Sequence, residues 1–296
     1  LTALTAISAE IFYDFSINTK SPIHMSKLNN LVQKATNTNG SEEDASAKYS
    51  GLTGTPEMKK WYGENGEDVY IMSDSFRLHG KLFKNPGTKY ALVCHGYTSK
   101  AKHMAGFVNK FHSLGYNVLA GDARAHGDSE GTKIGMGWAE RFDVIEWINY
   151  IISLEADAQI ILHGVSMGAS TVLMASGEEL PKNVKAIIAD CGYTSEWDEF
   201  RQEADVLHIP WFPVLNASSA ISKVRDGYDF KQASAVEQVK KSHTPTLFIH
   251  GSEDELVPYG MLNELYSAAN CEKEILTIQG AGHALSSSVA PELYWN

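Results

Sequence analysis

Residues 159–176 read QIILHGVSMGASTVLMAS, and this stretch decides the fold that the sequence predicts. Its apolar start, residues 159–163, is typical of a strand buried on both faces, and residues 168–176 have helical spacing. Between them lies GVSMG, residues 164–168, a G-x-S-x-G pattern. A serine in such a sharp strand-to-helix turn takes a positive φ, and the flanking glycines let strand and helix approach closely. The pattern in this position predicts Ser166 as a nucleophile.

Short apolar runs continue on both sides of this stretch and alternate with helical spacing. We expect strands at residues 69–72, 78–83, 90–94, 117–120, 159–163, 186–190, 246–250 and 274–278. Helices are expected at residues 105–113, 140–152, 168–176 and 261–269. The first two strands pair around a Ser-Asp-Ser turn, and the later alternation of strands and helices favours parallel neighbours. The predicted fold class is α/β, with a mostly parallel eight-stranded sheet flanked by helices.

The chain is expected to divide into a leader and one catalytic domain. A short helix is expected near residues 28–34, and residues 36–55 form a linker rich in Asn, Ser, Gly and Glu. The N-terminal helical leader and linker are therefore placed at residues 1–55. The catalytic domain then covers residues 56–296. Within it, residues 192–244 separate two consecutive strands by far more than a usual connection. This interval predicts a small helical lid insertion.

Four aromatic residues are candidates for substrate binding. Trp197, Trp211 and Phe212 lie in the predicted lid, where they could cover an acyl pocket. Trp138 follows a glycine-rich loop and could line the same pocket. The alternative is structural: the lid aromatics pack only on the core, and Trp138 anchors the start of a helix.

A serine hydroxyl needs a base within hydrogen-bond reach and an acid that orients the base. His283 is predicted as the base, because it lies in the glycine-rich loop Gly-Ala-Gly-His after the last expected strand. Asp254 is predicted as the acid, in the loop that follows the preceding strand. Spacing alone leaves Glu253 open as the acid, and Asp190 at the end of another strand is a further alternative.

The negative carbonyl oxygen that forms during attack needs two amide donors. We expect one from Met167, the residue after the nucleophile, and one from Tyr97 in the loop after the strand at residues 90–94. The Tyr97 ring could also wall the pocket, and its hydroxyl could be a third donor. The polar loop at residues 121–129 is interpreted as structural, held by pairing of its Asp and Arg side chains; the alternative is direct contact with substrate.

Charge and cysteine content exclude some other classes of protein. The formal net charge of -11 at pH 7 argues against nucleic-acid binding, which needs clustered Lys and Arg. The three cysteines are widely separated and form no CxxC spacing, so neither a metal site nor a disulfide framework is predicted. No metal and no organic cofactor are expected.

The first fifteen residues, LTALTAISAEIFYDF, place Leu4, Ile7, Ile11 and Phe15 on one helical face. The stretch is too short and too polar to span a bilayer. It is either the tail of a removed membrane anchor or signal sequence, or an amphipathic helix packed on the domain. The protein is accordingly expected to be membrane-associated through a removed N-terminal segment, or cytoplasmic.

The motifs together resemble the α/β-hydrolase superfamily. H-G-Y, D-x-R-x-H-G-x-S, G-x-S-x-G, H-G-x-x-D-x-x-V-P and G-A-G-H occur in the order the superfamily shows, from about Val69 to the end of the chain. The whole looks most like the bacterial YqkD-like branch, grouped with serine aminopeptidase-like and Bem46-like hydrolases. Ala125 departs from the pattern, since relatives commonly have glycine before this His-Gly pair.

The sequence therefore predicts a serine hydrolase that cleaves carboxylic esters, with short to medium acyl groups, through an acyl-enzyme. Its partner is a small-molecule ester or amide. One alternative is a serine peptidase or amidase acting on small peptides or amides, because the same machinery cleaves both bonds. Another is a non-catalytic binding protein that retains the fold.

Overall fold

The computed structural model describes residues 3–27, 49–206, 208 and 210–296. Eight strands form one sheet in the order β1-β2-β4-β3-β5-β6-β7-β8. The strands are β1 (Glu67–Ser73), β2 (Phe76–Phe83), β3 (Lys89–Cys94), β4 (Asn117–Gly121), β5 (Gln159–Val165), β6 (Val184–Asp190), β7 (Thr246–Gly251) and β8 (Lys273–Ile278). β1 and β2 run antiparallel to each other, and β2 runs antiparallel to β4. All later pairs are parallel, which confirms the predicted fold class.

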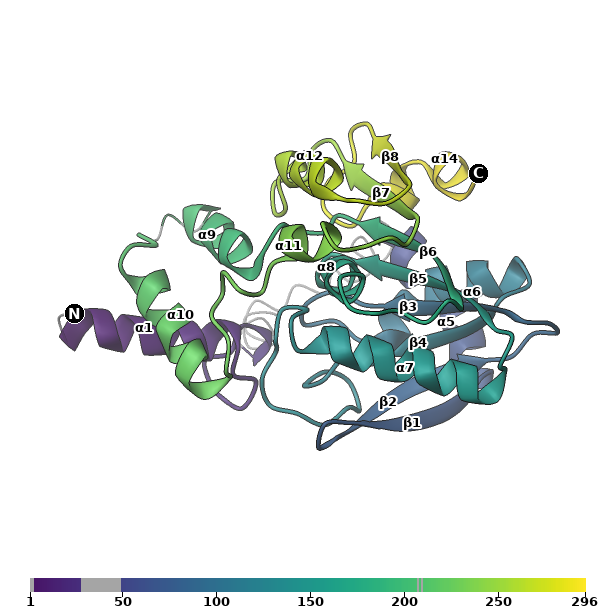
Figure 1. Cartoon of the computed structure of the whole chain (residues 1–296), viewed down its shortest axis with the longest axis horizontal. Helices are drawn as coiled ribbons and strands as arrows, with labels where there is room; N and C mark the ends of the chain where they lie inside the picture. Colours follow the sequence, from purple (N-terminus) through teal and green to yellow (C-terminus); the bar gives the residue numbers. More distant parts are fainter. Residues whose placement is uncertain (1–2, 28–48, 207, 209) are drawn as a thin grey trace.

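Helices cover both faces of the sheet (Figure 1). The two helices that follow the sequence pattern most closely are α6 (Ala105–Ser113) and α7 (Glu140–Leu154), on opposite faces. The other helices described are α1 (Ala3–Ser16), α4 (Ser50–Thr53), α5 (Pro56–Glu64), η1 (Ala101–Met104), α8 (Met167–Ala175), α9 (Glu196–Val206), α10 (Val214–Arg225), α11 (Ala235–Val239), α12 (Tyr259–Ala268), α13 (Ser286–Val289) and α14 (Pro291–Trp295).

Alternation along the central strands supplies two apolar cores. Leu92 of β3 is buried in one core with Ile148 of α7, whereas its neighbours Ala91 and Val93 belong to the other core with Phe107 of α6. Because successive strand side chains point to opposite faces, a continuous apolar run is needed to satisfy both cores. The parallel strands all end at the same edge, where the loops after β3, β5, β7 and β8 meet.

The interval predicted as a lid contains α9, α10 and α11, and α1 lies alongside α10 at the left end of the molecule in Figure 1. The Tyr13 hydroxyl donates to Asp226 at 2.8 Å, and the Ser218 hydroxyl donates to the Ala9 carbonyl at 2.9 Å. Tyr13 is buried in the main core, so the described part of the expected leader packs on the domain. The expected helix near residues 28–34 and most of the expected linker lie outside the described residues.

The face of α1 that packs differs from the apolar face seen in the sequence. Leu4, Ile7 and Ile11 are exposed, whereas Ala9 and Tyr13 are buried. The small Ala9 allows close approach to α10, and Tyr13 combines an apolar ring with a hydroxyl that finds a buried acceptor. No helix in the described part of the chain is long and apolar enough to cross a membrane.

Candidate active site

Ser166 lies in a strained turn between β5 and α8. Its φ of 57° and ψ of -122° are unfavourable for a residue with a side chain. The Ser166 amide donates to the Asp190 carbonyl at 2.9 Å, which fixes the turn to β6. A Cβ atom at Gly164 would overlap the Gly168 carbonyl, and one at Gly168 would overlap the Cys94 carbonyl. Both glycines are therefore required by close backbone approach, as the G-x-S-x-G pattern predicts.

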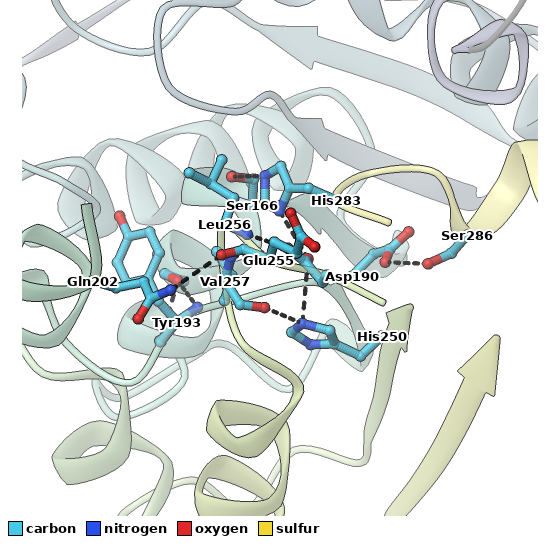
Figure 2. A network of polar contacts seen from close by, with 12 residues as sticks. Ser166, Asp190, Tyr193, Gln202, His250, Glu255, Leu256, Val257, His283 and Ser286 are labelled. Carbon is cyan, nitrogen blue, oxygen red and sulfur yellow. Dashed lines mark hydrogen bonds and ion pairs between the residues drawn. The ribbon is translucent and has the colours of Figure 1, made fainter. Parts of the chain in front are cut away.

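A continuous hydrogen-bonded chain joins three of the predicted residues (Figure 2). His283 Nε2 lies 2.9 Å from Ser166 Oγ, and His283 Nδ1 lies 2.9 Å from Asp254 Oδ2. The three side chains come from the β5–α8 turn, the loop after β7 and the loop after β8. This arrangement allows proton transfer from the serine to an imidazole whose second nitrogen is held by a carboxylate.

The loop after β7 holds Asp254 in its ionised form. Burial disfavours the charge, but hydrogen bonds from His250, His283 and the Val257 amide outweigh it and lower the pKa of Asp254 to about 2. Asp254 Oδ1 accepts from the amides of Leu256 and Val257 at 3.0 and 2.9 Å. The fully buried His250 lies with Nε2 3.3 Å from Asp254 Oδ2 and 2.8 Å from the Val257 carbonyl oxygen. His250, interpreted from the sequence as structural, thus also contacts the acid.

The two alternative acids lie elsewhere. Glu253 is exposed. Asp190 is buried and accepts from the Ser286 hydroxyl at 3.0 Å, and burial raises its pKa to about 6. Of the three acids, Asp254 is the one hydrogen-bonded to His283.

The loop after β3 passes directly over Ser166. A Cβ atom at Gly96 would lie 3.4 Å from Ser166 Cβ, so the backbone that carries Tyr97 is next to the nucleophile. Met167 is the first residue of α8, and the amides of a first helical turn have no intrahelical acceptor. The structure thus brings both predicted amide donors to the serine. The Tyr97 ring lines the adjoining pocket, but its hydroxyl donates to the Ser16 carbonyl of α1 at 2.7 Å and is not a third donor.

A pocket of about 370 Å³ opens beside Ser166 and His283. Most of its other walls are apolar side chains from the N-terminal segment, the sheet and the lid: Met25, Leu52, Met104, Met136, Val165, Val206 and Leu256. A cavity of this size with mostly apolar walls is typical of a binding site for a small molecule.

The four predicted substrate-binding residues are placed away from this pocket. Trp138 stacks under the Arg141 guanidinium at 3.5 Å, which fits its alternative role at the start of a helix. Trp197 packs edge-on against Trp211, with ring centroids 6.4 Å apart. Phe212 is 67% exposed and borders a separate apolar groove beside α1. Trp138, Trp197 and Trp211 pack against the main core, as the structural alternative expects. The lid residues that line the pocket are Glu199, Glu203 and Val206 of α9.

Two acidic residues of α9 were missed by the sequence analysis. Glu199 and Glu203 both line the pocket, one helical turn apart. Their i, i+4 spacing places them on one helix face, but nothing in the local pattern indicates that this face is buried. Burial raises the pKa of Glu199 well above its usual range and that of Glu203 to about 7.

The loop at residues 121–129 is structural, as interpreted, but its pairing differs. Asp122 accepts from the Ala101 amide at 2.7 Å and lies 2.7 Å from His79 Nδ1. Arg124 pairs with Asp143 at 2.5 Å. Asp122 and Arg124 therefore hold the loop through separate partners, because each side chain points to a different neighbouring element.

Two groups of described residues have side-chain atoms close enough to hold a metal ion: Cys191 with Asp254 and His283, and His79 with Asp122 and Asp128. In the first group, Asp254 and His283 are already hydrogen-bonded to each other, and His283 also to Ser166. In the second, Asp122 already accepts from two backbone amides and His79. Both groups are accounted for by protein hydrogen bonds.

The sheet order and the strained serine turn define the α/β-hydrolase architecture. A family model described as alpha/beta hydrolase fold matches residues 92–213. The chain is 30% identical to the uncharacterized protein YqkD of Bacillus subtilis over 66% of this chain and 65% of YqkD. It is 26% identical to the lysophosphatidylserine lipase ABHD12 of Macaca fascicularis over 71% of this chain and 48% of that protein.

A structure of the Pyrococcus furiosus esterase Pf2001 superimposes with a TM-score of 0.65, at 24% identity, over 81% of this chain and 90% of the esterase. At this identity the likeness shows the fold alone. The chain has the α/β-hydrolase fold, and its similarities are to proteins of the α/β-hydrolase superfamily. The similarity to YqkD agrees with the branch that the motifs predict, although the match spans less than two thirds of YqkD and about half of ABHD12.

Proposed function

We propose that the protein is a serine hydrolase that cleaves carboxylic esters of short to medium acyl length. The observation that carries this proposal is the continuous hydrogen-bonded chain from Ser166 through His283 to Asp254. Donor and acceptor atoms are 2.9 Å apart in both bonds, and Ser166 and His283 lie on the wall of a largely apolar pocket. A nucleophile, an oriented base and two nearby amide donors are the components that acyl transfer needs.

The proposed reaction has two halves. His283 Nε2 takes the Ser166 hydroxyl proton as Oγ bonds to the ester carbonyl carbon, and the carbonyl oxygen becomes negative beside the Met167 and Tyr97 amides. The carbonyl then re-forms, and the alcohol leaves with the proton from His283. Water attacks the acyl-enzyme in the same way, with His283 again as base, and releases the acid. Asp254 stabilises the imidazolium in both halves.

Two further observations support an ester as substrate. The apolar walls suit an acyl chain, because they gain by removing its surface from water. Among the related proteins, ABHD12 is named a lipase, although less than two thirds of it is covered. The amide alternative shares the machinery and has no separate observation in its favour.

The test is hydrolysis of p-nitrophenyl butyrate together with labelling by a fluorophosphonate probe. Wild type is expected to react in both assays, and Ser166→Ala to react in neither while keeping its melting temperature within a few degrees. Retention of most activity in Ser166→Ala would refute the proposal. A panel of p-nitrophenyl esters of graded length beside aminoacyl anilides separates esterase from peptidase, and absence of labelling in wild type would favour the non-catalytic alternative.

Membrane association remains a prediction. Its structural support is the outer face of α1, where Leu4, Ile7 and Ile11 are exposed. Co-sedimentation with neutral phosphatidylcholine vesicles tests it, with a triple serine variant of these residues as the control.

A further inference from the structure

The pocket beside Ser166 contains an acidic feature that the proposed reaction does not use. Glu199 is only 4% exposed, it lines the pocket, and its Oε2 atom has no hydrogen-bond partner among the described residues. Glu203 lines the same pocket from the next turn of α9. A buried carboxyl oxygen without a partner is costly, and Glu199 differs from Glu196 of the same helix in lining a pocket, where a ligand can supply the missing partner.

The surroundings of these two groups define the charge of that partner. Burial is the main cause of the raised pKa of the Tyr97 hydroxyl, and the charge of Glu203 adds to it. Burial is also the main cause of the raised pKa of Glu199, and the charges of Glu203, Asp254 and Asp198 add to it. No Lys or Arg is among the described residues that line the pocket. An anionic group would therefore find no counter-charge on the pocket wall, whereas a cationic group would favour the ionised form of both carboxyl groups and supply their counter-charge.

We propose that Glu199 and Glu203 form a cation subsite, through which the enzyme selects esters that carry an ammonium group. The proposal rests on the proposed ester hydrolysis at Ser166. An ammonium group between the two carboxyl groups would form charge-assisted hydrogen bonds or ion pairs with both, inside a pocket where water screens little. Binding would convert the carboxyl groups to carboxylates and release protons to the solvent.

Two isosteric substrate pairs test the subsite and show which side of the ester carries the cation. Butyrylthiocholine and its neutral carbon analogue S-(3,3-dimethylbutyl) thiobutyrate place the cation in the leaving group. The p-nitrophenyl esters of 6-aminohexanoic and heptanoic acid place it in the acyl group. For at least one pair, wild type is expected to favour the cationic member in kcat/KM by roughly 10- to 100-fold, the size of one or two charge-assisted hydrogen bonds.

The variants Glu199→Gln and Glu203→Gln keep the side-chain shape and remove the charge. Each is expected to lower the cationic-to-neutral ratio of kcat/KM by roughly 10-fold or more, because the cationic ester loses its counter-charge and the neutral ester does not. Glu196→Gln is the matched control, because Glu196 is buried in the same helix with no partner for either oxygen and does not line the pocket. Its ratio should equal that of wild type.

The pH dependence of the ratio gives an independent readout. The groups around the two carboxyl groups are Asp198, Asp254, Tyr97, Tyr193 and His283. Any effect of His283 on chemistry is shared by both members of a pair and cancels in the ratio. The preference for the cation should therefore fall below about pH 7, where Glu203 is protonated.

A ratio near one for both pairs in wild type, or a ratio unchanged in both Gln variants, would overturn the subsite. Equal loss of cationic and neutral activity would overturn it too, because it would show a structural role. Calorimetric titration with butyltrimethylammonium measures binding without turnover. Binding by wild type and by Glu196→Gln, but not by Glu199→Gln, would support the subsite. Equal binding by all three proteins would contradict it. Failure of the proposed hydrolysis would instead appear as absence of Ser166 labelling by a neutral fluorophosphonate.

Discussion

Replacement of Asp254 by asparagine tests the proposed reaction at its most buried link. The amide has the same shape and can still accept from the Leu256 and Val257 amides, which donate to Oδ1 at 3.0 and 2.9 Å. It removes the negative charge 2.9 Å from His283 Nδ1 and offers an N–H group there, which favours the wrong imidazole tautomer. We expect kcat on p-nitrophenyl butyrate to fall by ~10³- to 10⁴-fold, with KM changed little.

The same substitution should carry a stability signature with a defined pH range. Hydrogen bonds from His250 and His283 outweigh burial and lower the pKa of Asp254 from 3.8 to about 2. This difference corresponds to about 2 kcal/mol of folding free energy. Because the folded pKa lies below the unfolded one, the contribution is present above about pH 4 and is lost as pH falls through about 2. Urea unfolding should show wild type more stable than the Asn variant at pH 7, with the gap closing in acid.

Glu253→Gln is the control, because it removes an exposed carboxylate from the adjacent position. It should leave both kcat and the acid part of the stability curve close to wild type. The reasoning would be refuted by an Asp254→Asn variant that keeps more than a tenth of the wild-type kcat. A stability gap of equal size at pH 7 and in strong acid would contradict the electrostatic part.

Further predictions concern the turn, the loops and the lid. Gly168→Ala should cost about 3 kcal/mol in chemical unfolding, because the new Cβ would overlap the Cys94 carbonyl. Tyr97→Phe should lose about 1 kcal/mol of stability with the bond to Ser16, and should lower kcat less than the ~10²-fold of a deleted oxyanion donor. Ala125→Gly should raise stability by about 0.5 kcal/mol, because Ala125 has a φ of 62°. Burial raises the pKa of Glu196 well above its usual range. Glu196→Gln should therefore stabilise the protein at pH 8, where the side chain is charged in the unfolded state, and should do little at pH 4, where it is largely neutral in both states.

The parts of the fold that the sequence predicted depend on local pattern. Strands such as Gln159–Val165 must be apolar on both faces, and the turn after it needs glycine at two positions where a Cβ would overlap backbone. Ala125 shows the limit of such rules, since an alanine occupies a left-handed conformation, with a φ of 62°, that favours glycine. Its neighbours hold it there: the Ala125 amide donates to the Glu130 carbonyl at 2.9 Å.

The lid and the N-terminal segment could not be predicted in the same way, because their contacts are between elements far apart in sequence. Trp197 and Trp211 attract attention as large aromatic residues, but they pack against each other, and the pocket is lined by the acidic side of α9. Nothing local indicates that Tyr13 would pair with Asp226, more than two hundred residues away. Composition indicates which residues can be buried but not which helix face a distant partner will cover.

The N-terminal segment links the lid to the oxyanion loop. Helix α1 is held to α10 through Tyr13 and Ser218, and at its other end the Ser16 carbonyl accepts the buried Tyr97 hydroxyl. Met25, a few residues further along, forms part of the pocket wall. A displacement of the lid would therefore be transmitted to the loop that carries one of the proposed amide donors. Helix α9 of the same lid carries Glu199 and Glu203. The residues proposed to bind the substrate are therefore connected, through α10 and α1, to the loop proposed to stabilise its transition state.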